Sequence, residues 1–173
     1  AIFFDEHDVR PMGRTAVGVR GIRLREGDYV VGAARARAGK CVLSITENGY
    51  GKRTPVEEYR ITNRGGVGIK NYAVTDKTGP VVGIKVVDGS EDLLVVTQAG
   101  ILIRTHVENV KITSNRATQG VIVMRFKEAG DRVIALALAD REEDAQSGDA
   151  TQENQVQAAE TAPETQETQS GEE

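Results

Sequence analysis

The chain repeats itself with a period near fifty residues, and this repeat constrains the fold more than any other feature. The segment LSITENGYGKRTPVEEYRIT (43–62) aligns without a gap with LVVTQAGILIRTHVENVKIT (94–113), and nine of the twenty positions are identical. Chance gives about one identity in such an alignment. An earlier, partial copy aligns DVRPMGRTAVGVRG (8–21) with EYRITNRGGVGIKN (58–71). A repeat of this length indicates a row of similar supersecondary units.

Each copy carries the signals of β-strands. Short apolar runs are followed by ENG or QAG, where glycine supplies the positive φ of a hairpin turn. No segment of the body shows a convincing helical period. The predicted strands are Cys41–Thr46, Tyr50–Pro55, Val67–Tyr72 and Val81–Val87 in one copy, and Leu93–Thr97, Ile101–Thr105, Val121–Phe126 and Val133–Leu138 in the next.

Four strands per fifty residues are typical of a propeller blade, so we predict an all-β, propeller-like fold. The expected divisions are a partial blade (1–40), a blade (41–91) and a final blade (92–141). Propellers have about four to eight blades, so this set is incomplete. Since the sequence lacks an initiator Met and opens inside a strand-like segment, we expect it to be part of a larger protein.

Charge is divided sharply along the chain. Residues 1–141 hold all 22 Lys and Arg and 16 of the 26 Asp and Glu, a net charge of +6. Residues 142–173 hold ten acids and no base, a net charge of −10. With one large apolar residue and no aromatic, this last segment is expected to be a disordered tail. A basic body with an acidic tail favours a polyanionic partner for which the tail competes.

The glycine-rich stretch ITNRGGVGIKN (61–71) raises the question of a nucleotide-binding loop. Its glycines lack the G-x-G-x-x-G spacing, and it precedes a predicted strand rather than a helix. GYGKRT (49–54) resembles the end of a Walker A loop, but Arg53 stands where Ser or Thr belongs. We therefore interpret the stretch as a blade turn in which Arg64 and Gly68 recur, as Arg-x-x-x-Gly, at 14–18 and 116–120.

No catalytic or metal-binding group of residues stands out. The two histidines are isolated, and the lone cysteine, Cys41, has no placed partner and is expected to be a small strand residue. The carboxylates of Glu57 and Glu58 point to opposite faces of a strand, which makes them a poor acid–base pair. We therefore predict no catalytic residue and no metal site in this chain.

The recurring cations are the strongest functional signal. A repeat places equivalent side chains along one rim, and a band of cations there suits a curved phosphate backbone without reading bases. Aromatic platforms for single strands are nearly absent, so duplex DNA is the better fit. In a second interpretation, a protein-binding propeller, these residues only solvate the rim. The predicted DNA contacts are Arg10, Arg14, Arg20, Lys52, Arg53, Arg60, Arg64, Lys70, Arg104, Lys111 and Arg116.

Two long strings carry a family resemblance. GYGKRTPVEEYRITNRGGVGIKN (49–71) and DVRPMGRTAVGVRGIRLREGD (8–28) closely resemble blades of the DNA gyrase A C-terminal domain family. The likeness covers about residues 1–141. It implies a β-pinwheel, whose strands swap between neighbouring blades and whose basic perimeter wraps duplex DNA. Phe3 departs from the pattern, since it aligns with Arg53.

The resemblance also implies partners and a role in a whole enzyme. That enzyme is a type IIA topoisomerase that introduces negative supercoils with ATP and Mg²⁺, assembled from gyrase B and a second copy of gyrase A. Its nucleophilic tyrosine, its ATPase and the gyrase box lie elsewhere, so we expect no cofactor in this chain. The equivalent domain of topoisomerase IV is the close alternative. The acidic tail either tunes wrapping or only aids solubility.

Location follows from the same observations. One cysteine cannot form an internal disulfide, which favours a reducing compartment, and no apolar run is long enough to span a membrane. The acidic turn after AIFF excludes a signal peptide there. The expected location is the bacterial cytoplasm, in association with the nucleoid.

Overall fold

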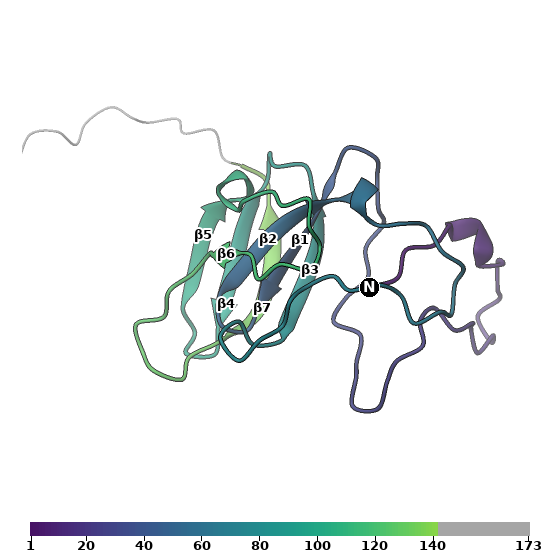
Figure 1. Ribbon diagram of the computed structural model, residues 1–173, viewed down its shortest axis with the longest axis horizontal. Coiled ribbons are helices and arrows are strands. Elements are labelled where there is room, and N and C mark those ends of the chain that lie inside the picture. Colours follow the sequence, from purple (N-terminus) through teal and green to yellow (C-terminus); the bar gives the residue numbers. More distant parts are fainter. Residues whose placement is uncertain (142–173) are drawn as a thin grey trace, which may run out of the picture. The chain divides into compact units, whose positions relative to one another are not determined.

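The computed structural model describes residues 1–141, whose strands form two antiparallel sheets (Figure 1). The first has the order β3-β1-β2-β6 and the second the order β5-β4-β7. The strands are β1 (Cys41–Thr46), β2 (Tyr50–Pro55), β3 (Val81–Val87), β4 (Asp92–Thr97), β5 (Leu102–His106), β6 (Val121–Ile122) and β7 (Val133–Ala139). These residues contain no α-helix, and the all-β prediction is confirmed.

Two hairpins, β1–β2 and β4–β5, form for the same local reason. Gly49 and Gly100 take φ values of +77° and +82° in their turns. The hydroxyls of Thr46 and Thr97 accept the backbone N–H four residues further on, at 3.2 and 3.3 Å. Turn chemistry therefore explains the identical Thr and Gly of the two copies; the sequence predicted the role of the glycine, and the structure adds that of the threonine.

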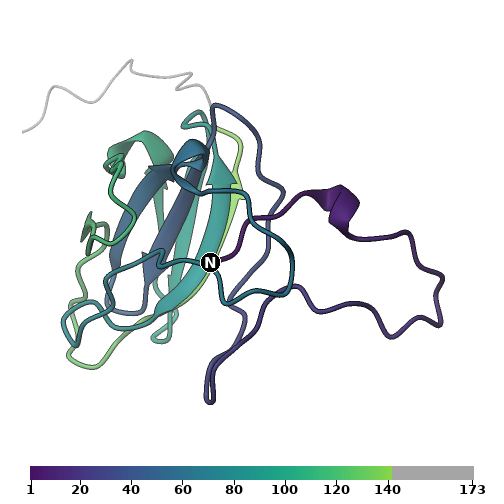
Figure 2. The ribbon, with the colours of Figure 1, turned by 45° about the vertical axis from the view of Figure 1, so that its right-hand side comes forward.

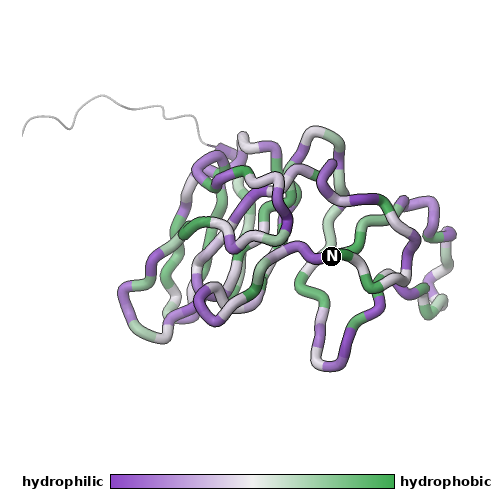
Figure 3. Tube along the Cα trace, viewed as in Figure 1, coloured by the Kyte–Doolittle hydropathy of each residue, from purple (hydrophilic) through white to green (hydrophobic). Residues whose placement is uncertain are grey.

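The main core lies between the two sheets. Leu43 and Ile45 of β1 pack with Leu93 and Val95 of β4, and all four are essentially inaccessible to solvent. The sheets approach so closely that a Cβ placed on Gly83 would overlap the side chain of Leu136. Figure 3 shows that the strands carry most of the hydrophobic stretches, whereas many loop tips are hydrophilic.

The repeats exchange strands. β6 belongs to the third copy in sequence, yet it pairs with β2 of the second, with Gly51 opposite Val121. Next to it, the backbone N–H of Thr113 donates to the carbonyl of Arg53 at 2.8 Å. The equivalent bond one repeat earlier runs from Thr62 to Phe3, also at 2.8 Å. The swap expected of a pinwheel is thus present, and Phe3 occupies the position equivalent to Arg53.

Two strand predictions were wrong: one predicted strand is absent and the other is shorter than expected. Residues 67–72 form no strand, because the backbone opposite them supplies only the pair of hydrogen bonds between Ala1 and Ile69. Of the predicted strand at 121–126, only Val121 and Ile122 pair, since β2 offers them just Tyr50 and Gly51. Residues 1–37 form loops and the 3₁₀ turn η1 (Glu6–Asp8), shown in purple and blue in Figure 2.

The segment between β2 and β3 covers the other face of the first sheet. It begins with the 3₁₀ turn η2 (Val56–Glu58), and the third copy has the matching turn η3 (Val107–Asn109). The Tyr59 hydroxyl donates to the side chain of Asn71, whose amide donates to Ser44 Oγ at 3.0 Å. This cover buries the polar side chains of β1 and β2, including that of Lys52.

Nothing in residues 1–141 is a helix long and apolar enough to cross a membrane. The predicted acidic tail, 142–173, lies outside the described residues.

Candidate nucleic-acid interface

The eleven predicted cations fall into three groups by exposure. Lys52 and Arg53 are buried, and Arg64 and Arg116 are half-buried. The remaining seven are exposed: Arg10, Arg14, Arg20, Arg60, Lys70, Arg104 and Lys111. Most of the predicted residues therefore lie at the surface, but the two from β2 lie beneath it.

Lys52 projects from β2 into the cover over the first sheet. Its ammonium donates to the carbonyls of Asn115 (3.4 Å) and Arg116, and it lies 5.1 Å from the centre of the Tyr72 ring. Burial, and then the positive charge of Arg116, lowers the pKa of Lys52 to about 8. Lys52 is thus an internal cation that fixes the turn beginning at Asn115.

This pKa gives a first testable prediction. The usual lysine pKa is 10.5, so between about pH 8 and about pH 10.5 the unfolded chain keeps a proton that folded Lys52 has released. The contribution of Lys52 to the free energy of unfolding should therefore rise with pH in this window, and it appears as the difference between the wild type and a variant without this ammonium. Denaturant unfolding at about pH 7.5 and about pH 9.5 checks it, and Lys52→Met should remove the rise. Equal pH dependence in the two proteins would contradict the assignment.

Arg53 is buried where the two sheets meet. Its Nε donates to the carbonyl of Val110 at 2.6 Å, and Nη2 donates to that of Glu108 at 2.9 Å. Its guanidinium is therefore committed to the backbone of the next repeat, immediately after the 3₁₀ turn η3. We no longer expect Arg53 or Lys52 to touch a ligand on the surface of the protein.

Arg64, the recurring arginine of the glycine-rich stretch, is also occupied internally. Its guanidinium donates to the carbonyl of Arg20 at 2.6 Å and to that of Asp8 at 3.4 Å. Nearby, the N–H of Arg23 donates to the carbonyl of Gly66 at 2.8 Å, and the N–H of Gly65 donates to that of Gly21 at 2.7 Å. Arg64 thus holds the first arginine-rich loop against the second repeat.

Arg104 aligns with Arg53 but has a different environment. Its Nε pairs with Asp92 Oδ2 at 2.7 Å, and its Nη2 donates to the carbonyl of Asp140 at 3.0 Å. His106 Nδ1 lies 2.6 Å from Asp92 Oδ1. The hydrogen bond with His106, and then Arg104, lowers the pKa of Asp92. Sequence reasoning missed this cluster, which joins the start of β4 to the end of β7.

The exposed surface also includes arginines that the repeat did not single out. Arg125 and Arg132 are two of them, in the last repeat. The others lie close together in the first 37 residues and have no recurring counterpart, so alignment of the copies could not select them. These are Arg23, Arg25, Arg35 and Arg37.

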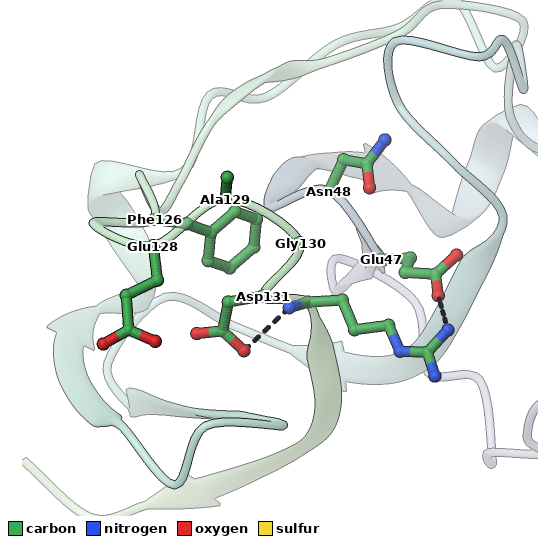
Figure 4. Close-up of a pocket in the computed structure, with 8 residues that line it drawn as sticks. Glu47, Asn48, Phe126, Glu128, Ala129, Gly130 and Asp131 are labelled. Atoms are coloured by element: carbon green, nitrogen blue, oxygen red, sulfur yellow. Dashed lines mark hydrogen bonds and ion pairs between the residues drawn. The ribbon is translucent and has the colours of Figure 1, made fainter.

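A cavity of about 500 Å³ lies at the turn end of the sheets (Figure 4). It is lined by Glu47, Asn48, Phe126 and residues 128–132. Arg132 pairs with Glu47 at 2.9 Å, and Asp131 accepts the backbone N–H of Ala99 at 3.0 Å. Three carboxylates against one arginine in this lining disfavour an anionic ligand, so the cavity is a poor site for a phosphate group.

Comparison with known proteins identifies the family. The family model described as "DNA gyrase C-terminal domain, beta-propeller" matches residues 2–37, 42–88 and 91–140. The DNA gyrase A protein of Staphylococcus epidermidis is 50% identical over 145 residues, which are 83% of this chain and 16% of that protein. The Staphylococcus aureus protein is 50% identical over 147 residues, 84% of this chain and 16% of that protein.

Solved structures agree with the sequence comparison. The DNA gyrase A C-terminal domain matches with a TM-score of 0.71 and 28% identity, over 78% of this chain and 45% of that one. The C-terminal domain of DNA topoisomerase IV shares the fold, with a TM-score of 0.73 and 24% identity over 80% of this chain and 43% of that one. The chain thus spans only part of the proteins it matches, and it belongs to the family of DNA gyrase A C-terminal domains, which are β-pinwheels.

Proposed function

We propose that this chain binds duplex DNA through its phosphate backbone, without sequence preference. One observation carries the proposal: a set of cations on the described surface makes no side-chain hydrogen bond or ion pair within residues 1–141. An uncompensated positive surface of this kind supports counterion-releasing contacts with a polyanion. The set is Arg10, Arg14, Arg60, Lys70, Lys111, Arg116 and the side chain of Arg20.

In the whole enzyme, we propose that this module wraps DNA and so directs ATP-dependent negative supercoiling. The staphylococcal relatives are gyrase proteins, which favours gyrase over topoisomerase IV. The proposed partners are gyrase B and a second copy of gyrase A. ATP and Mg²⁺ would serve those parts of the enzyme, and no catalytic step is assigned to this chain. A bacterial cytoplasmic, nucleoid-associated location goes with this role.

Binding should be steeply salt-dependent. Titration of a long duplex with the full chain should give an affinity that falls linearly with salt on logarithmic axes, by about 0.9 per phosphate contact. Two duplexes of equal length and different sequence should behave alike. A protein-binding propeller predicts no shift of the duplex even at low salt, and that result would refute the proposal.

The acidic segment provides a separate prediction. Ending the chain at Arg141 removes ten acids and changes the net charge from −4 to +6. If residues 142–173 compete with DNA, the shortened chain should bind duplex more tightly, and the difference should shrink as salt screens the charges. A shortened chain whose affinity equals that of the full chain at low salt would leave only a passive, solubilising role.

A further inference from the structure

The recurring motif Arg-x-x-x-Gly has two different fates in this structure. Arg64 of the second copy donates to two carbonyls of the first. Arg116 occupies the same motif position in the third copy, yet its guanidinium has no hydrogen-bond or ion-pair partner among residues 1–141. The difference is therefore one of surroundings, and it leaves Arg116 available to a ligand.

The turn that carries Arg116 is held from inside by its carbonyl groups. The Lys52 ammonium donates to the carbonyls of Asn115 and Arg116, and the Tyr72 hydroxyl donates to that of Gln119. The backbone N–H of Ala73 donates to the carbonyl of Thr118 at 3.1 Å. Four carbonyls in five residues are thus satisfied by donors from the second repeat.

The amide groups of the same turn are used differently. Ala117 donates its N–H to the side chain of Asn115 at 2.9 Å. The N–H groups of Arg116, Thr118 and Gln119 have no acceptor in the part of the chain that the structure describes. Unpaired amides next to a free guanidinium, with buried Lys52 adding positive charge below, form the surroundings that a phosphate oxygen requires.

We propose that the turn 115–119 is a seat for one phosphodiester group of the DNA backbone, with Arg116 as its contact and Lys52 and Tyr72 as positioning residues. The inference rests on the proposed function and sharpens it. Arg116 and the turn amides meet the phosphate directly. Lys52 and Tyr72 act through the turn, by holding its carbonyls inward so that the amides and the guanidinium remain available. Arg64 has no such role, because its guanidinium is already bonded.

Substitution of Arg116 tests the contact. Arg116→Gln should reduce the slope of the logarithmic salt plot by about 0.9, which is a loss of about eightfold in affinity near 0.1 M salt. Arg64→Gln is the comparison variant at the equivalent motif position, and it should keep the wild-type slope. An unchanged slope in Arg116→Gln would overturn the proposal.

Tyr72→Phe tests the positioning role with little risk to folding, because only the hydroxyl that bonds Gln119 is removed. One lost hydrogen bond of about 1 kcal/mol corresponds to a loss of about fivefold in DNA affinity. In the double variant with Arg116→Gln, the loss of binding free energy should be smaller than the sum of the two single losses, since both residues act at one seat. Tyr59→Phe is the matched control: it removes a tyrosine hydroxyl whose bond is to Asn71 and to no atom of the turn 115–119, and it should leave DNA affinity unchanged.

The outcomes separate this inference from the proposed function. The wild type could bind duplex in a salt-dependent way while the losses of binding free energy from Tyr72→Phe and Arg116→Gln simply add in the double variant. That result would overturn the phosphate seat but leave the proposed duplex binding intact. Lys52→Met should weaken binding and Lys52→Arg should restore it, with thermal unfolding recorded for each variant to show that it is folded. A folded Lys52→Met that binds as tightly as the wild type, or a folded Lys52→Arg that binds no better than Lys52→Met, would remove Lys52 from the proposal. Absence of duplex binding by the wild type would overturn both proposals together.

Discussion

Gly120→Ala should lower the free energy of unfolding by about 3 kcal/mol or more. Gly120 has a φ of +70°, and an added Cβ would overlap the carbonyl oxygen of Gly51 and press on the Tyr72 hydroxyl. Those atoms belong to β2 and to the cover of the first sheet, so the clash cannot be relieved by rotating one flexible side chain. The Gly51–Val121 pairing of the exchanged strand should be disrupted.

The repeat supplies a matched control for this substitution. Gly18 occupies the same motif position in the first copy, with a φ of +90°, but a Cβ there would meet no atom within 4 Å. Gly18→Ala should therefore cost only the strain of the left-handed backbone, about 1 kcal/mol. Denaturant unfolding of the two variants measures the difference. Equal losses of stability would show that backbone strain, and not the approach of the exchanged strand, requires the glycine.

Arg53→Met should destabilise the protein by about 2 kcal/mol. The methionine can fill much of the space, but the carbonyls of Glu108 and Val110 lose their donors in a buried place, and each unsatisfied carbonyl costs about 1–3 kcal/mol. The gain from no longer burying a charge offsets part of this cost. Unfolding by denaturant, monitored by circular dichroism, would give the value.

The same substitution at the aligned position gives the comparison. Arg104→Met should cost less, about 1 kcal/mol, because the Arg104 side chain is partly exposed and the buried Asp92 carboxylate keeps its hydrogen bond with His106. On DNA binding, Arg53→Met should leave the salt slope unchanged if it stays folded, since Arg53 is too deeply buried to touch a phosphate. A lower slope for folded Arg53→Met would contradict the structural role assigned to this residue.

The parts of the fold that sequence predicted are those decided locally. The hairpins β1–β2 and β4–β5 follow from a Thr, a turn glycine and flanking apolar runs, all within a dozen residues. The exchanged strand was expected only through family resemblance, because nothing within 121–126 says that its partner lies at Tyr50 and Gly51. Its length was overestimated for the same reason: a strand extends only as far as its partner does.

The candidate site shows the same division. Repetition selected the recurring arginines as candidate DNA contacts, but it could not tell an internal donor from a surface cation. Arg53 and Arg104 share a motif position, but their exposure to solvent differs. Arg53 is buried where the two sheets meet, whereas Arg104 is exposed. Arg64 and Arg116 differ likewise, through carbonyls contributed by a distant part of the chain. The position of an arginine in its repeat sets the direction of its side chain, but not whether the guanidinium finds an acceptor inside the protein.

The exchanged strand β6 has a consequence for the order in which the protein is made. The edge of the first sheet at β2 is completed by residues synthesised some seventy positions later, so it stays open while the third repeat emerges from the ribosome. An open strand edge can pair with another chain, and pairing over such a sequence separation is slow. Each repeat therefore matures only when its successor arrives, and the nascent chain is most vulnerable to misassociation in the interval between them.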